Sequence, residues 1–174
     1  MRNLIYIILL LVNYVGYSCS CNPYRLMEQQ QREMQSECIF IGKVIKVNDD
    51  LTYKIQVVES LDGGDVQDNI YIGQNWKTCY PYIEENGFWL FYGRIVDGFF
   101  KVNRCGLSRP FDHPFASLSD SDEVQKLSRK LDSENLVEKE ADIIFKQMQL
   151  MDLANEIKAL RRRRDSYLRP NKIN

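Results

Sequence analysis

The residues of this 174-residue chain with the clearest chemical potential are its five cysteines. Two form a Cys-x-Cys pair and three are spread along the chain: Cys19, Cys21, Cys38, Cys79 and Cys105. The single histidine, His113, rules out a His-rich metal centre, and the Cys-x-Cys spacing is too tight for the usual structural zinc sites. We therefore expect disulfide chemistry, with one thiol left over because the number is odd.

The residues before Cys19 indicate the compartment. Arg2 is followed by the apolar run Leu4–Val12, and small residues, Gly16 and Ser18, stand three positions and one position before Cys19. This is the layout of a secretory signal peptide with its cleavage site. The run is shorter than the roughly 20 residues of a transmembrane helix, and no later stretch qualifies. We expect residues 1–18 to be removed and the protein to be secreted, in a compartment that favours disulfides.

A bacterial lipoprotein signal is the alternative, because such signals also end directly before a cysteine. They usually carry Leu, Val or Ile three positions earlier, where this chain has Gly16. In that case Cys19 carries a lipid anchor and the protein is a cell-surface or periplasmic lipoprotein. A lipidated Cys19 has neither a thiol for a disulfide nor a free α-amine.

Composition and motifs argue against several functions. The 23 basic and 24 acidic residues give a net charge of −1, without the basic excess typical of nucleic-acid binders. The chain has no Gly-x-Ser-x-Gly elbow, no phosphate-binding Gly-rich loop and no paired His/Cys nucleophile. Glu84 and Glu85 are adjacent and more typical of a loop, and His113 between Asp112 and Pro114 predicts an exposed turn. We expect no catalysis and no cofactor of its own.

The elements that position these cysteines are mostly strands. Pro23–Ser36 predicts a short helix, and turn residues at 48–50 and 97–98 separate segments with β-type alternation. The expected strands are Cys38–Val47, Leu51–Leu61, Asn69–Gly73, Gly87–Val96 and Phe99–Cys105. Five strands at this spacing predict a small closed or nearly closed barrel. Cys38 opens the first strand, where a free thiol behaves as a small hydrophobe. The remaining cysteines then pair the N-terminal Cys-x-Cys with Cys79 and Cys105.

The chain changes character after the strands, because residues 117–168 contain neither glycine nor proline. Apolar residues recur there at three- and four-residue steps, and the phase shifts near Asp132-Ser133, which predicts two helices. Their apolar stripe is expected to pack on the barrel or between the helices, and a coiled-coil or partner-binding helix is the alternative. The run Arg161–Arg164 is interpreted as a solvated helix end.

Several segments together resemble the tissue inhibitors of metalloproteinases (TIMPs). Cys19-Ser20-Cys21-Asn22-Pro23, directly after the signal, resembles the N-terminus of that family. Further similar segments are Ser36–Val44, Thr78-Cys79-Tyr80, Tyr92–Phe99, Cys105, Pro110 and Ser117-Leu118-Ser119. The resemblance covers about residues 19–118 and is specific as a combination. It implies a five-stranded OB-fold barrel, the netrin-like module, over 19–118, with a helical extension over 119–174. It also implies the pairs Cys19–Cys79 and Cys21–Cys105, with Cys38 as the free thiol.

The same resemblance implies an inhibitory mechanism. The free α-amine and the carbonyl oxygen of Cys19 would chelate the catalytic zinc of a partner metalloendopeptidase, where a water normally occupies the open position. Ser20 would point into the specificity pocket of the protease, and Cys21, Asn22 and Pro23 would lie along its cleft. Thr78 would contact the opposite side. The zinc in this mechanism belongs to the partner.

The chain also departs from the family. The inhibitory domain of the family has a third disulfide, and both of its cysteines are missing from this chain. Cys38 stands at a position that the family fills with an apolar residue. The cysteine-rich second domain of the family is replaced by the helical extension. The alternative function is therefore a non-inhibitory netrin-like binding or structural module, exported and lipidated at Cys19.

Overall fold

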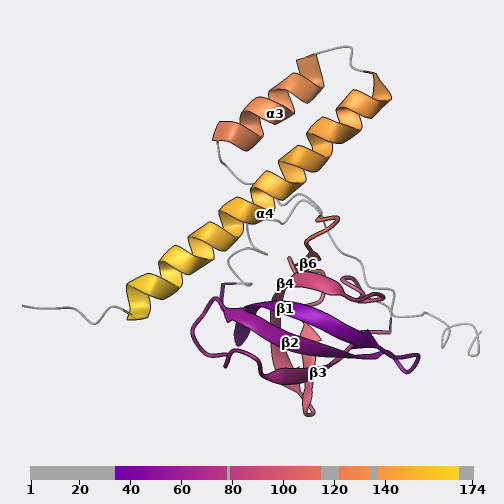
Figure 1. The fold of residues 1–174 in the computed structure, drawn as a ribbon, viewed down its shortest axis with the longest axis vertical. Coiled ribbons are helices and arrows are strands. Elements are labelled where there is room, and N and C mark those ends of the chain that lie inside the picture. Colours follow the sequence, from indigo (N-terminus) through magenta and orange to yellow (C-terminus); the bar gives the residue numbers. More distant parts are fainter. Residues whose placement is uncertain (1–33, 78, 115–121, 134–136, 169–174) are drawn as a thin grey trace, which may run out of the picture.

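The computed structural model describes residues 34–77, 79–114, 122–133 and 137–168. These residues form a β-barrel crossed by a long helix, which carries a shorter helix on its far half (Figure 1). The elements are β1 Cys38–Val47, β2 Thr52–Ser60, β3 Ile70–Gln74, β4 Gly87–Val96, β5 Phe99–Val102, β6 Arg109–Pro110, α3 Asp122–Ser133 and α4 Glu138–Leu168.

The barrel is closed because its first strand pairs on both edges. The strand order is β1-β2-β3-β5-β4, and β1 also pairs with β4, which returns the sheet to its start. All these pairings are antiparallel except β3–β5, which is parallel. This closed, mixed five-stranded sheet is an OB-fold-like barrel. β6 adds two residues outside it, paired with β4.

The hairpins follow from the turn residues of the sequence. In the β1–β2 turn, the Asp50 Oδ1 accepts a 3.1 Å hydrogen bond from the Thr52 N–H, and Leu51 takes a left-handed conformation with φ 68°. In the β4–β5 turn, Asp97 and Gly98 have φ values of 53° and 80°, as a two-residue turn with positive φ at both positions requires. Both predicted turns are confirmed.

A first apolar core fills the barrel. The largest fully buried members include Phe40, Phe91 and Phe100, whose ring centroids lie 5.2 to 5.6 Å apart. Tyr53 also lies in this core, and its ring packs directly against Gly73. A Cβ atom at position 73 would lie only 2.1 Å from this ring. Glycine at position 73 is therefore required for the ring to fit inside the barrel.

A second apolar core joins the barrel to α4. The barrel contributes side chains from β1, β4 and the segments that follow β2 and β5, and α4 contributes three residues of its C-terminal half. The buried members are Ile39, Ile41, Leu61, Leu90, Tyr92, Leu107, Leu153, Ile157 and Leu160. The apolar stripe was expected to pack on the barrel or between the helices. In its C-terminal half, α4 packs on the barrel.

The N-terminal half of α4 buries a different side. Ile144 and Met148 are buried where α3 lies alongside α4, and α3 buries Val124. Met148 and Ile157 are nine residues apart, which at about 100° per residue places them on opposite sides of the helix. The apolar stripe therefore changes side along α4, because each half has a different neighbour.

A buried charge cluster also joins α4 to the barrel. Arg109 of β6 is fully buried, and its Nη1 lies 2.9 Å from Asp152 Oδ2 of α4. Its Nη2 pairs with Glu156, whose Oε1 accepts a 2.5 Å hydrogen bond from the Tyr92 hydroxyl. Nothing in the sequence predicts this cluster, since an arginine followed by a proline carries no signal of burial.

The secondary structure agrees closely with the sequence patterns. β1 and β4 have the predicted bounds, and the other three barrel strands differ at their ends. Two helices occur as predicted, and the first of them, α3, ends at the predicted break, 132–133. β6 was not predicted, because two residues show no periodicity. Of the predicted helix Pro23–Ser36, residues 23–33 lie outside the described residues, and residues 34–36 include a turn. Among the described residues, no helix has both the length and the apolar character needed to cross a bilayer.

Candidate functional site

Three of the predicted site residues are described: Cys38, Cys79 and Cys105. Cys79 and Cys105 lie in neighbouring loops at one end of the barrel. Cys79 follows β3, Cys105 follows β5, and both are disulfide-bonded. The other cysteines of the predicted pairs, Cys19 and Cys21, lie outside the described residues, so the pairing Cys19–Cys79 and Cys21–Cys105 stays a prediction. Ser20, Asn22, Pro23 and Thr78 also lie outside them, and their protease contacts stay predictions as well.

The backbone holds the two anchor cysteines close together. The N–H of Cys105 donates a 2.7 Å hydrogen bond to the carbonyl oxygen of Tyr80, the residue after Cys79. Cys105 itself has a φ of 52°. This is the left-handed region, which non-glycine residues adopt rarely and mostly in tight turns. Segments separated by a strand pair thus place two disulfide sulfurs at the same end of the barrel.

The loop that carries Cys79 is fastened on both sides. Asn75 is buried, its Nδ2 donates to the Ile83 carbonyl at 2.8 Å, and its Oδ1 accepts from the Ile83 N–H at 2.9 Å. The next residue, Trp76, donates its Nε1–H to the carbonyl of Val102 at 2.7 Å. These hydrogen bonds fix the loop on the barrel.

A pocket of about 580 Å³ lies beside Cys105. Its walls include Trp76 and Arg104, the segment before β1 with Glu37, and Arg94 of β4. The Arg104 guanidinium lies 4.0 Å from the centre of the Trp76 ring, and the Lys101 ammonium lies 4.6 Å from it. The sequence did not predict this pocket, because its walls come from four separate segments.

Cys38 is a free, buried thiol in the first core. Burial, and next the nearby carboxyl of Asp65, raise the pKa of this thiol to about 12. Asp65 accepts a 2.7 Å hydrogen bond from the Tyr71 hydroxyl, and its own pKa is raised chiefly by burial. A thiol with this pKa stays protonated at neutral pH and is neither a nucleophile nor a metal ligand.

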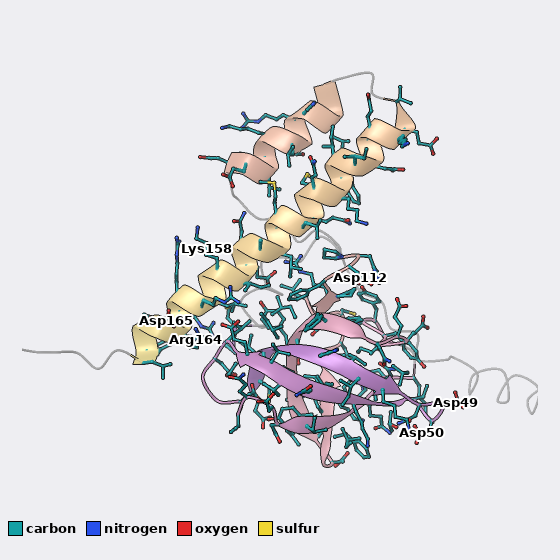
Figure 2. The ribbon with its side chains drawn as sticks, viewed as in Figure 1. Asp49, Asp50, Asp112, Lys158, Arg164 and Asp165 are labelled. Atoms are coloured by element: carbon teal, nitrogen blue, oxygen red, sulfur yellow. The ribbon has the colours of Figure 1, made fainter. Side chains whose placement is uncertain are left out.

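One cluster of possible metal ligands occurs among the described residues. Glu85, Asp112 and His113 place one ligand atom each within 4.8 Å of one another. All three side chains are exposed; Asp112 Oδ1 lies 2.8 Å from His113 Nδ1 and also accepts a 3.0 Å hydrogen bond from the His113 N–H. The β4–β6 pairing brings Asp112 toward the segment before β4, which the sequence did not predict (Figure 2).

The arginine run, interpreted from the sequence as a solvated helix end, has exposed members in Arg161 and Arg162, and part of it also has partners on the barrel. Arg161 Nη2 and Arg164 Nη1 lie 2.5 and 3.0 Å from the carboxylate of Glu59 on β2. Arg164 also donates to the carbonyl of Ser60 at 2.7 Å. The hydrogen bonds from Arg161 and Arg164 lower the pKa of Glu59, and the bond from Arg161 has the larger effect. Figure 2 shows Arg164 where the end of α4 meets the barrel.

Comparisons with known proteins add no assignment. No protein-family model matches the chain, and no curated protein matches it either. The fold and the geometry around the two anchor cysteines are therefore the basis for a functional proposal.

Proposed function

We propose that this chain is a secreted, non-catalytic inhibitor of zinc metalloendopeptidases, in which Cys19 chelates the catalytic zinc of the protease. One observation carries the proposal. Two disulfide-bonded cysteines, Cys79 and Cys105, lie in loops that a backbone hydrogen bond joins at one end of an OB-fold-like barrel. Disulfides from there to Cys19 and Cys21 would hold a short N-terminal segment on that end.

The chemistry of chelation fits a mature N-terminus at Cys19. An α-amine has a pKa of about 7.7 to 8, so a substantial neutral fraction exists at neutral pH and has a lone pair for the metal. Together with the Cys19 carbonyl oxygen it would replace the water at the open position of a catalytic zinc. Ser20 would then enter the specificity pocket, with Asn22 and Pro23 along the cleft and Thr78 opposite.

The disulfides supply the rigidity that this mechanism needs. A flexible N-terminal segment would lose conformational freedom on docking, and this loss would weaken inhibition. Two bonds to a loop and a turn that the barrel already fixes remove most of that freedom before binding. The pairing that supports this is Cys19–Cys79 and Cys21–Cys105, with Cys38 outside the frame.

An added residue before Cys19 tests the proposal directly. Mature protein that begins at Cys19, verified by mass, is assayed against a panel of zinc endopeptidases, beside a form with one alanine before Cys19. The extension converts the α-amine into an amide and moves the charge, so inhibition should fall by about 100-fold or more, roughly 3 kcal/mol of binding. Lys158→Ala, on the outer face of α4, is the matched control and should inhibit like the parent (Figure 2). Equal potency of the extended form would refute chelation.

The mass of the natural N-terminus separates this proposal from its alternative. An unmodified Cys19 is required for chelation. An acylated Cys19 would instead support a surface-anchored netrin-like binding module, because the acyl group blocks the amine.

A further inference from the structure

Three cationic side chains lie in or next to the pocket beside Cys105. Arg94 and Arg104 line the pocket, and Lys101 lies over the same Trp76 ring as Arg104. In the part of the chain that the structure describes, none of these three cations takes part in an ion pair. The acidic residue of the wall, Glu37, accepts a 3.3 Å hydrogen bond from the N–H of Ile95.

The strand register forces two of these cations together. Arg94 of β4 is the direct cross-strand partner of Lys101 of β5, so their side chains leave the same face of the barrel. Like charges in directly opposite positions destabilise a strand pair. An anion bound between them would reverse that effect, which makes the arrangement more consistent with a binding site than with a structural one.

Trp76 gives the pocket a rigid floor. Its indole N–H is fixed on the carbonyl of Val102 at 2.7 Å, so the ring cannot turn away when Lys101 and Arg104 stack on it. Stacking on an aromatic face orients a guanidinium while leaving its N–H donors free to bind a ligand in the ring plane. The donors of Arg104 are therefore positioned before any ligand arrives.

We propose that this hollow, the Trp76 pocket, binds the carboxylate of an aspartate or glutamate side chain of a partner protein. Two arginines match the planar, bidentate geometry of a carboxylate. Glu37 in the same lining disfavours a ligand with many negative charges, such as a sulfated polysaccharide. The pocket works independently of zinc chelation, although Cys105 in its lining is also a proposed anchor of the N-terminal segment.

A peptide titration tests the pocket without a protease. The probe is acetyl-Ala-Glu-Ala-Glu-Ala-amide, added to ¹⁵N-labelled full-length mature protein and followed by NMR. The indole N–H of Trp76 is one of two tryptophan signals and reports on the pocket itself. It should shift and saturate with the acidic peptide, together with the amides of Gly93 and Arg104, and binding should weaken at high salt.

Substitutions define which groups are responsible. Arg94→Gln combined with Arg104→Gln should weaken binding by about tenfold or more, the loss expected when charge-assisted hydrogen bonds are removed. Arg162→Gln makes the same chemical change at an exposed position of α4 and should bind like the parent. Because all three are exposed side chains, the variants are expected to fold, and their spectra verify it.

Three results would overturn the proposal. One is an equal shift with the glutamine peptide acetyl-Ala-Gln-Ala-Gln-Ala-amide, which would mean that charge is not recognised. Another is unchanged binding by the double variant. The third is tighter binding of a sulfated oligosaccharide than of the acidic peptide, with shifts spread over the arginines of α4, which would indicate a polyanion surface instead.

Discussion

The thiol of Cys38 shows how one residue type takes opposite roles within a single chain. Cys79 and Cys105 are oxidised at the end of the barrel, whereas Cys38 is reduced inside it. The difference is one of position, because Cys38 faces the first core and lies beside the carboxyl of Asp65. Burial of a thiol next to an acid keeps it protonated and away from an oxidant.

We predict that Cys38 is unreactive in the folded protein. At neutral pH, iodoacetamide should leave Cys38 unmodified for hours, and should alkylate one thiol per chain when denaturant is added without reductant. The physical reason is that the reactive species is the thiolate, and a pKa of about 12 leaves almost none of it. Intact-mass spectrometry counts the label. Rapid labelling of the native protein would show that the thiol is accessible and ionised.

At the scale of elements, α4 and the barrel meet through two kinds of contact. The apolar contact uses Leu153, Ile157 and Leu160, and the polar contact uses the buried Arg109 with Asp152 and Glu156. Burial raises the pKa of Glu156, which Arg109 counteracts. The arginine therefore compensates two acids that α4 brings into a place largely closed to water.

Substitution of Arg109 alone should lower the free energy of unfolding strongly, whereas substitution of all three charged residues of the cluster should lower it much less. Arg109→Met leaves two buried acids without this cation, and the free energy of unfolding should fall by about 3 to 5 kcal/mol. The triple variant Arg109→Met, Asp152→Leu, Glu156→Leu should recover most of this loss, because apolar residues replace the charges together. Urea unfolding of the three proteins measures both values. A single variant as stable as the parent would mean that the cluster does not hold α4.

The elements differ in how far the sequence predicts them, for physical reasons. β1 and β4 were predicted to the residue, because long strands with apolar alternation and defined turns carry their signal locally. The side of α4 that meets the barrel was not predicted, since the stripe changes side where the neighbour changes. The Trp76 pocket and the Arg109 cluster depend on residues far apart in sequence, and a charged residue alone does not reveal whether it is buried.

At the scale of the whole molecule, the barrel and α4 share a core and are not independent. Without α4, six apolar barrel residues of the second core would face water: Ile39, Ile41, Leu61, Leu90, Tyr92 and Leu107. Each fully buried side chain of this kind contributes about 1.5 to 3 kcal/mol when removed from water. A boundary at residue 118, which the family resemblance suggests, would therefore separate parts that stabilise each other.

We predict that a chain that ends at residue 118 is much less stable than the full protein. It should bind a hydrophobic dye such as ANS and unfold at lower denaturant concentration, or aggregate. The full-length protein with Lys158→Ala serves as the control for a change in α4 that leaves the shared core intact. Unfolding at the same urea concentration for the truncated and full chains would show that the barrel is a self-sufficient domain.

The clamp between Arg164 and Glu59 has a consequence for how the chain is made. These residues are 105 positions apart, and Arg164 is among the last residues of α4. Synthesis proceeds from the N-terminus, so β2 is complete long before its partner emerges from the ribosome. The second core thus closes only after α4 has been synthesised, and until then the barrel shows an open apolar face. A premature stop in the last few codons of the helix would therefore be felt in strands translated much earlier.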